Sequence, residues 1–288
     1  MHRFTLAVVA ALAAALAVVS LSAAAPQQKQ ATHRYPHRII SLSPTVTEDL
    51  FAIGAGRRVV AVDNQSNFPK RAPHTSLSGY TPNVEAIAKY HPHLVLISYD
   101  PGDLATQLHK LGIKVVNEAA ANNLKQAYGE ILGLGRLTGH LRGAKAVVHS
   151  MRTHLAAIVA GVPTTRRHLR VYHELDPTYY SATSSTFIGS IYKLFGFRDI
   201  ADAADGAGGG YPQLSGEYIV AKDPQIIVLA DTRCCGQSYG NVAERPGWAT
   251  ITAVRHHRVV SANDDVASRW GPRIVQFART VARIAKQG

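Results

Sequence analysis

Short apolar runs alternate with amphipathic segments along most of this 288-residue chain. The continuous apolar runs predict strands at residues 38–42, 59–62, 94–98, 113–116, 169–173, 226–230 and 258–261. The amphipathic segments predict helices at residues 45–53, 83–88, 103–111, 185–195 and 217–222, with a last one beginning near Pro272. Apolar strands that alternate with helices are typical of parallel sheets covered on both faces. The pattern therefore predicts an α/β fold.

One segment occurs twice in similar form. The first copy has a polar cap residue at Asn83 and a glutamate at Glu85, and the second has Ser215 and Glu217 in their places. In each copy a proline and an apolar strand follow. A carboxylate in the first turn of a helix is favourable by about 0.3–1 kcal/mol, which explains one glutamate but not two at matching places. The repeat predicts two similar lobes, as in a two-lobed binding protein.

A long amphipathic helix is predicted between the two copies. Apolar residues recur three and four positions apart between residues 140 and 160, so they share one helix face. About 20 helical residues span roughly 30 Å, long enough to connect two lobes. We therefore expect an N-terminal α/β lobe at 38–139, a linker helix at 140–162 and a C-terminal α/β lobe at 163–288.

The N-terminal segment predicts export. Residues 1–25 begin with basic residues, continue as an apolar run and end in small residues, as a secretory signal peptide does. The alternative is a retained anchor, because about 20 apolar residues can span a bilayer. Residues 26–37 read as a polar tether. We expect a protein in the periplasm or on the outer face of the cytoplasmic membrane, and no lipid anchor, because no cysteine lies near the cleavage site.

Charge narrows the choice of partner. Lys and Arg number 31 against 19 Asp and Glu, a net charge of +12. Such an excess suits nucleic acid, an anionic membrane surface or an acidic ligand. The basic residues are scattered, however, and no basic stripe interleaved with aromatic residues is present. With export, this predicts that the chain does not bind nucleic acid.

The sequence lacks the motifs of common catalytic and metal sites. It has no phosphate-binding loop and no nucleophile elbow, and its histidines lack zinc-site spacing. A secreted enzyme and a Zn or Mn receptor are therefore the less favoured alternatives, and we expect no catalytic residue and no metal site. His173, at the end of a predicted strand, is the histidine placed to face a cleft.

The chain has two cysteines, and they are adjacent. The Cα atoms of Cys234 and Cys235 are about 3.8 Å apart, closer than in most disulfides. An oxidising compartment favours a disulfide between them, and the alternatives are two thiols or a soft-metal pair. They follow the strand at 226–230, at the end of the sheet where such folds bind ligands, so they are cleft candidates.

Four stretches resemble the periplasmic binding proteins for cobalamin and iron siderophores. They are residues 38–54, 83–95, 211–217 and 268–273, and the resemblance covers the chain from Arg38 onward. It implies a class III periplasmic binding protein with two Rossmann-like lobes, parallel sheets and a backbone helix. It also implies a ligand held between the lobes, delivery to an ABC permease, and a monomer.

The resemblance assigns roles to individual residues. Glu85 and Glu217 match the family's glutamates that dock with arginines of the permease. Tyr211 stands where cobalamin binders have Trp, Tyr80 lies beside a similar position, and Gln65 replaces a family Tyr. With the residues at strand ends, the predicted cleft comprises Ser43, Pro44, Gln65, Tyr80, His173, Tyr179, Tyr211, Cys234, Cys235, Asp265, Arg269 and Trp270.

The expected ligand is a corrinoid, most simply vitamin B12, because aromatic clefts with a few polar groups suit a flat macrocycle. Haem is an alternative, since the loop at 173–181 offers Tyr or His to iron. A ferric siderophore is another, with Arg269 and the overall excess of basic residues supplying positive charge. No covalently bound cofactor is expected.

Overall fold

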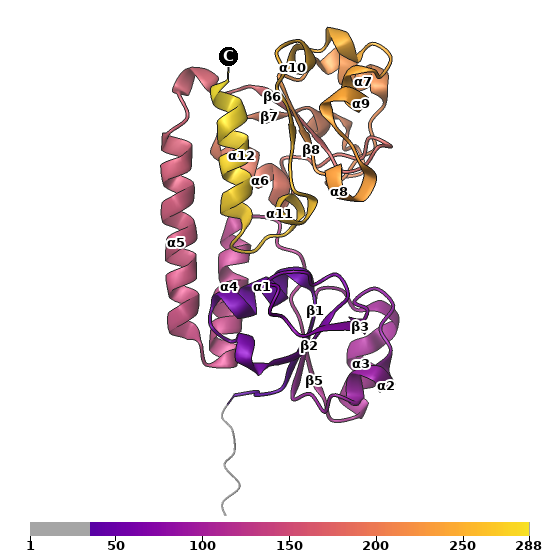
Figure 1. The fold of residues 1–288 in the computed structure, drawn as a ribbon, viewed down its shortest axis with the longest axis vertical. Coiled ribbons are helices and arrows are strands. Elements are labelled where there is room, and N and C mark those ends of the chain that lie inside the picture. Colours follow the sequence, from indigo (N-terminus) through magenta and orange to yellow (C-terminus); the bar gives the residue numbers. More distant parts are fainter. Residues whose placement is uncertain (1–34, 288) are drawn as a thin grey trace, which may run out of the picture. The chain divides into compact units, whose positions relative to one another are not determined.

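The structure is a computed structural model that describes residues 35–287. The predicted signal peptide at 1–25 and residues 26–34 of the predicted tether lie outside the described residues. Two separate sheets are present, and every strand pair in them is parallel. This confirms the predicted α/β class with two lobes (Figure 1).

The N-terminal lobe contains a five-stranded sheet in the order β3-β2-β1-β4-β5. Its strands are β1 (Ile39–Leu42), β2 (Val59–Asp63), β3 (His74–Leu77), β4 (Leu94–Ile97) and β5 (Lys114–Asn117). Its helices are α1 (Pro44–Ala52), α2 (Val84–Ala88), α3 (Leu104–Lys110) and α4 (Leu124–Thr138), with 3-10 turns at Gly56–Arg58 and Pro101–Asp103.

Both faces of this sheet are buried, as continuous apolar strands require. In β1, Ile39 packs into one core with α1 and α4 residues, and Ile40 packs into a second core beneath α2 and α3. Adjacent strand residues point to opposite faces, so the apolar run supplies both cores at once.

The C-terminal lobe contains a four-stranded sheet in the order β7-β6-β8-β9. Its strands are β6 (Arg170–Glu174), β7 (Arg198–Asp199), β8 (Ile226–Leu229) and β9 (Val259–Ser261). Its helices are α6 (Phe187–Leu194), α7 (Gly216–Lys222), α8 (Thr232–Cys235), α9 (Tyr239–Ala243), α10 (Thr252–Arg255), α11 (Asp264–Ser268) and α12 (Ile274–Lys286). Three 3-10 turns lie at Thr164–Arg166, Ile200–Ala204 and Trp248–Thr250.

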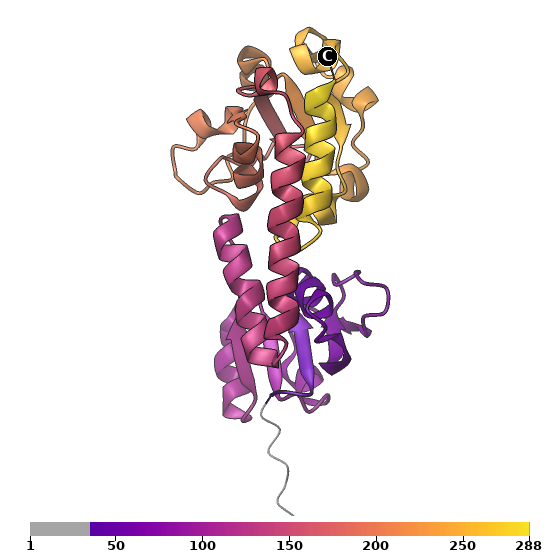
Figure 2. The same ribbon diagram turned by 90° about the vertical axis from the view of Figure 1, so that its left-hand side faces the viewer.

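Helix α5 (Leu141–Ala160) runs alongside both lobes and packs against α4 and α12 (Figures 1 and 2). Its buried residues are Ala144, Val148, Met151 and Leu155, all members of the predicted apolar stripe. Gly143 lies so close to α1 that a Cβ there would be 2.1 Å from the carbonyl oxygen of Ile53. The helix therefore lies directly against the N-terminal lobe.

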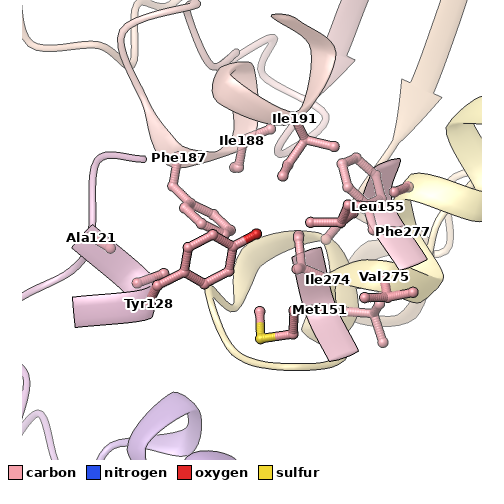
Figure 3. Close-up of a cluster of buried hydrophobic side chains, with 14 of the residues drawn as sticks. Ala121, Tyr128, Met151, Leu155, Phe187, Ile188, Ile191, Ile274, Val275 and Phe277 are labelled. Carbon is pink, nitrogen blue, oxygen red and sulfur yellow. The ribbon is translucent and has the colours of Figure 1, made fainter. Parts of the chain in front are cut away.

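The lobes also share an apolar core, which the sequence pattern did not predict. Ala121 and Tyr128 from the N-terminal side belong to the same buried cluster as Phe187 of α6 and Phe277 of α12 (Figure 3). The lobes are thus joined by packed side chains as well as by one helix. Apolar packing across this junction opposes large changes in the angle between the lobes.

Several elements escaped prediction because their sequences lack a clear period. Strand β3 lies at a sheet edge with His74 and Ser76 exposed, so it has no apolar run. Helices α8 to α11 are too short for amphipathic spacing. Among residues 35–287, none of the helices combines the length and apolarity needed to cross a bilayer.

Candidate ligand-binding cleft

A cavity of about 380 Å³ lies at the carboxyl ends of β1, β2, β3 and β4, facing the α11 segment. This sheet changes strand order between β1 and β4, and open α/β sheets bind ligands at such a switch point. The volume is within the usual range of small-molecule sites. The lining residues are Leu42, Ser43, Pro44, Thr45, Asp63, Gln65, Gly79, Tyr80, Ser98, Tyr99, Asp264, Asp265, Ser268, Arg269 and Trp270.

The floor of the cavity is built from strand ends and hydroxyl groups. Ser43 follows β1, and its Oγ accepts the N–H of Val46 as the cap of α1. The Ser98 hydroxyl, just after β4, donates to the Ser43 hydroxyl. Beneath them the Thr47 hydroxyl lies 2.9 Å from the Ser66 hydroxyl. The cavity therefore presents small hydroxyl groups that can donate to or accept from a ligand.

Two exposed tyrosines stand at the rim. Tyr80 is 73% exposed and Tyr99 is 62% exposed. Gly79 holds the Tyr80 loop against β1, since a Cβ there would be 2.5 Å from the Leu42 carbonyl oxygen. Exposed aromatic rings beside a cavity favour a ligand with a flat apolar surface.

Arg269 crosses from the C-terminal lobe to the N-terminal lobe. Its guanidinium donates to Glu48 Oε1 at 2.8 Å, to Asn67 Oδ1 at 2.9 Å and to Asp265 Oδ1 at 2.7 Å. The prediction that Arg269 offers free positive charge to a ferric siderophore is therefore wrong, because two carboxylates already pair with it. The charge of Arg269 therefore stabilises the contact between the lobes.

Arg273 reaches the same glutamate. Its Nε donates to Glu48 Oε2 at 2.7 Å, and its guanidinium lies 4.3 Å from the centre of the Phe68 ring. The three side chains are nearly buried. We call Glu48, Arg269 and Arg273 the inter-lobe clasp, because the glutamate lies on α1 and both arginines lie between α11 and α12.

Trp270 lies between the two arginines and forms part of the cavity wall. Its indole N–H donates to Glu130 Oε2 of α4 at 2.8 Å. The pKa of Glu130 is raised to about 7, mainly by burial; the hydrogen bond from Trp270 lowers it, and the nearby Glu118 carboxylate adds a smaller increase. Glu130 is thus an ionisable group one bond away from the cavity.

His173 is not at the cleft, and its predicted role is wrong. Its side chain is fully buried in the C-terminal lobe, where Nδ1 lies 2.6 Å from the Tyr192 hydroxyl and the ring packs on Phe277. Burial lowers its pKa to about 3. It lies on the inner strand β6, whose faces are covered by helices, so its position near a strand end did not bring it to solvent.

Tyr179 is also separated from the cavity. Its ring stacks on Trp248 with the centres 5.7 Å apart, and Arg245 lies 5.2 Å from the tyrosine ring. It lines a second pocket of about 720 Å³ on the C-terminal lobe, together with Glu217. The structure therefore corrects its predicted place in the cleft.

Tyr211 and the cysteines lie outside the cavity lining. Tyr211 is 48% exposed, and it remains only a predicted ligand contact. Cys234 and Cys235 are joined by a disulfide bond, which confirms that prediction, and both are exposed. The cysteines are connected to the cavity through Asp264, which lines it: the Asp264 carboxylate accepts a hydrogen bond from the Cys234 N–H at 2.9 Å.

Glu85 and Glu217 occupy equivalent places in the two lobes. Each is exposed in the first turn of its helix, α2 or α7, behind a capping side chain. The pKa of Glu217 is lowered by hydrogen bonds from its own backbone N–H and from Ser215. The two carboxylates therefore mark one point on the surface of each lobe.

Sequence reasoning found much of the cavity and missed several of its residues. It placed Ser43, Pro44, Gln65, Tyr80, Asp265, Arg269 and Trp270 in the cleft, and all of them line the cavity. It missed Ser98, the last residue of the strand predicted at 94–98, and Tyr99, which directly follows that strand as Ser43 follows another. Within residues 35–287, no group of three or more His, Cys, Asp or Glu side chains is placed to hold a metal ion.

Comparison with known proteins gives a consistent picture. The periplasmic binding protein family model matches residues 39–266. The chain is 30% identical over 267 residues to the uncharacterized ABC transporter substrate-binding lipoprotein YvrC of Bacillus subtilis, covering 90% of this chain and 82% of that protein. It is 32% identical over 249 residues to a cobalamin-binding protein of Halobacterium salinarum, covering 84% and 67%.

A solved structure shares the fold. The periplasmic vitamin B12 binding protein BtuF of Vibrio cholerae superimposes with a TM-score of 0.72 at 24% identity, covering 88% of this chain and 99% of that one. At this identity the likeness concerns the arrangement of lobes, sheets and backbone helix.

Proposed function

Because this chain belongs to the periplasmic binding protein family, we propose that it captures a corrinoid outside the cytoplasmic membrane and delivers it to an ABC importer. The role is binding and delivery without a catalytic step. The observation that carries the proposal is a cavity at the strand switch point, rimmed by two exposed tyrosines, in a chain similar to a cobalamin-binding protein along most of its length.

The chemistry of the cavity favours this ligand. A corrinoid combines a flat ring with peripheral amides, which both donate and accept hydrogen bonds. Tyr80 and Tyr99 offer aromatic surface for the ring, and the Ser43 and Ser98 hydroxyls offer polar partners for the amides. Such a mixture of aromatic surface and few polar groups is usual in small-molecule sites.

Haem is the second candidate, and it depends on one feature. Tyr80 and Tyr99 expose phenol groups at the rim, and a tyrosine can ligate haem iron. A ferric siderophore is less favoured, because the arginine in the cavity wall is already paired with Glu48 and Asp265.

We also propose that Glu85 and Glu217 dock the protein on its permease. Each lobe exposes one of them at a helix start, and paired negative points suit basic groups on a two-fold transporter. We propose that the protein acts as a monomer. We also propose that it carries no lipid, because its two cysteines are bonded to each other and neither is free for lipid attachment.

Thermal unfolding with added ligand tests the binding proposal. Cyanocobalamin at about 100 times its Kd should stabilise the protein by about 2.7 kcal/mol, which raises Tm by roughly 5–10 °C. Tyr80→Ala and Tyr99→Ala should reduce this shift, and Leu111→Ala, at an exposed apolar residue outside the cavity lining, should not. Stabilisation by haemin with a Soret band, and none by cyanocobalamin, would select haem; no shift with either would overturn the proposal.

Uptake measurements test the docking proposal separately. The double variant Glu85→Ala with Glu217→Ala should bind cyanocobalamin normally and lose transport in cells that carry the importer. Normal transport by this variant would show that the two glutamates are not the docking points.

A further inference from the structure

Trp270 connects the ligand cavity to a part of the N-terminal lobe that the ligand does not reach. The residue lines the cavity, and its indole N–H is bound to Glu130 of α4 at 2.8 Å. Glu130 itself is absent from the lining of that cavity and lies in a separate shallow pocket with Glu118. The two residues are 140 positions apart in the sequence, so this contact exists only in the folded protein.

Acidic residues of α1 lie close to the contact between Trp270 and Glu130. Asp49 is buried, and among the described residues its Oδ1 has no hydrogen-bond partner. Burial, followed by the charge of Glu48, raises the pKa of Asp49 well above its usual value. A Cβ at Gly271 would lie 3.1 Å from Asp49 Oδ1, so the chain after Trp270 is held closely against α1.

The neighbouring basic groups do not neutralise Glu130. Arg269 and Arg273, on either side of Trp270, both bind Glu48. The charged group that raises the pKa of Glu130 is Glu118, from the segment after β5, and Asp49 of α1 is a titratable neighbour whose own pKa Glu130 raises. The indole N–H is the contact through which Glu130 acts on the cavity wall.

We propose that Glu130 is a positioning residue that fixes the Trp270 ring as a wall of the ligand cavity, and that its charge state tunes ligand affinity with pH. This inference rests on the proposed function, since it assigns a role at that same cavity. Glu130 acts through Trp270 and does not touch the ligand.

The physical reason is the strength of the bond in its two charge states. A hydrogen bond to a carboxylate is roughly twice as strong as one between neutral groups. Since the pKa of Glu130 is about 7, the side chain changes between carboxylate and acid near neutral pH. Trp270 is held firmly above this pH and less firmly below it, so the cavity wall is better defined at higher pH.

Tryptophan fluorescence of the ligand-free protein tests the positioning role. The wild type should show a spectral change with a midpoint near pH 7 that is absent in Trp270→Phe and in Glu130→Gln. Glu118→Gln is the matched control, because it removes a neighbouring charge without touching Trp270; it should keep the change and move its midpoint to lower pH. A change that persists in Glu130→Gln would overturn the proposal, as would its absence in the wild type.

Binding of cyanocobalamin tests the effect on affinity. We expect the Kd of the wild type to rise about five-fold from pH 8 to pH 6, which corresponds to weakening one hydrogen bond. Glu130→Gln, which keeps an acceptor oxygen, should bind with a Kd that is constant over this range. A Kd with the same pH dependence in both proteins would refute the tuning. If cyanocobalamin and haemin both fail to bind, the proposed function fails, and the fluorescence measurement still decides the role of Glu130.

Discussion

Replacing Glu48 with alanine should destabilise the protein by disrupting the inter-lobe clasp. Glu48 is the carboxylate to which both arginines of the clasp bind, and its side chain is 2% exposed. Its removal leaves Arg273 without a carboxylate and Arg269 with only Asp265. A buried charge without its partner is poorly solvated, and this loss of solvation is the cause of the expected effect.

The size of the stability loss in Glu48→Ala follows from the burial of its ion pairs. Removing one member of a buried ion pair costs about 3–5 kcal/mol. We expect the low end, about 3 kcal/mol, because Arg269 keeps Asp265, Asn67 and the Gln65 carbonyl, and Arg273 keeps the Phe68 ring. For a protein of this size, such a loss lowers Tm by roughly 6–12 °C.

Calorimetry of matched variants gives the measurement. Arg233→Ala removes an ion pair to Asp265 in which the arginine is 64% exposed, so it should cost under about 1 kcal/mol. Arg273→Ala should cost less in the Glu48→Ala background than in the wild type, with a coupling energy of about 1–3 kcal/mol. The reasoning is refuted if Glu48→Ala lowers Tm no more than Arg233→Ala does, or if the coupling is near zero.

Three further results are expected. The buried His173 has a pKa of about 3 against an ordinary 6.5, so the unfolded chain binds the extra proton and stability falls below pH 6.5. Thermal unfolding between pH 6.5 and pH 4 should show a slope shallower by about 1.4 kcal/mol per pH unit in His173→Asn; an unchanged slope would show that the histidine is not buried. Thiol titration should find Cys234 and Cys235 unreactive until a dithiol reductant is added, and free thiols in the untreated protein would contradict the disulfide. Gly79→Ala should weaken cyanocobalamin binding at least ten-fold, because its Cβ would force the rim loop away from Leu42; unchanged affinity measured by titration would remove that loop from the site.

The lobes, their apolar strands and the long helix were predictable from the sequence because their signals are local, whereas the edge strands β3 and β7 have no such signal. A buried parallel strand needs a continuous apolar run, and an amphipathic helix needs apolar residues three and four apart. The glutamates of α2 and α7 were visible through the repeat around Glu85 and Glu217. Much of the cavity was visible too, because polar residues directly after parallel strands collect at one edge of the sheet.

The tertiary structure alone decided which polar residues meet. Arg269 and Glu48 are 221 positions apart, and the sequence around each residue gives no signal that the two form a buried ion pair. His173 ends a predicted strand much as Ser43 follows one, yet it is enclosed by residues of α6 and α12, and Ser43 lines the cavity. A period in the sequence records which side of an element is buried, but the burial of a charge or a polar ring depends on partners brought from distant parts of the chain. For that physical reason the sequence determined the scaffold and the strand-end residues, while the fold decided the clasp, the Glu130–Trp270 contact and the place of His173.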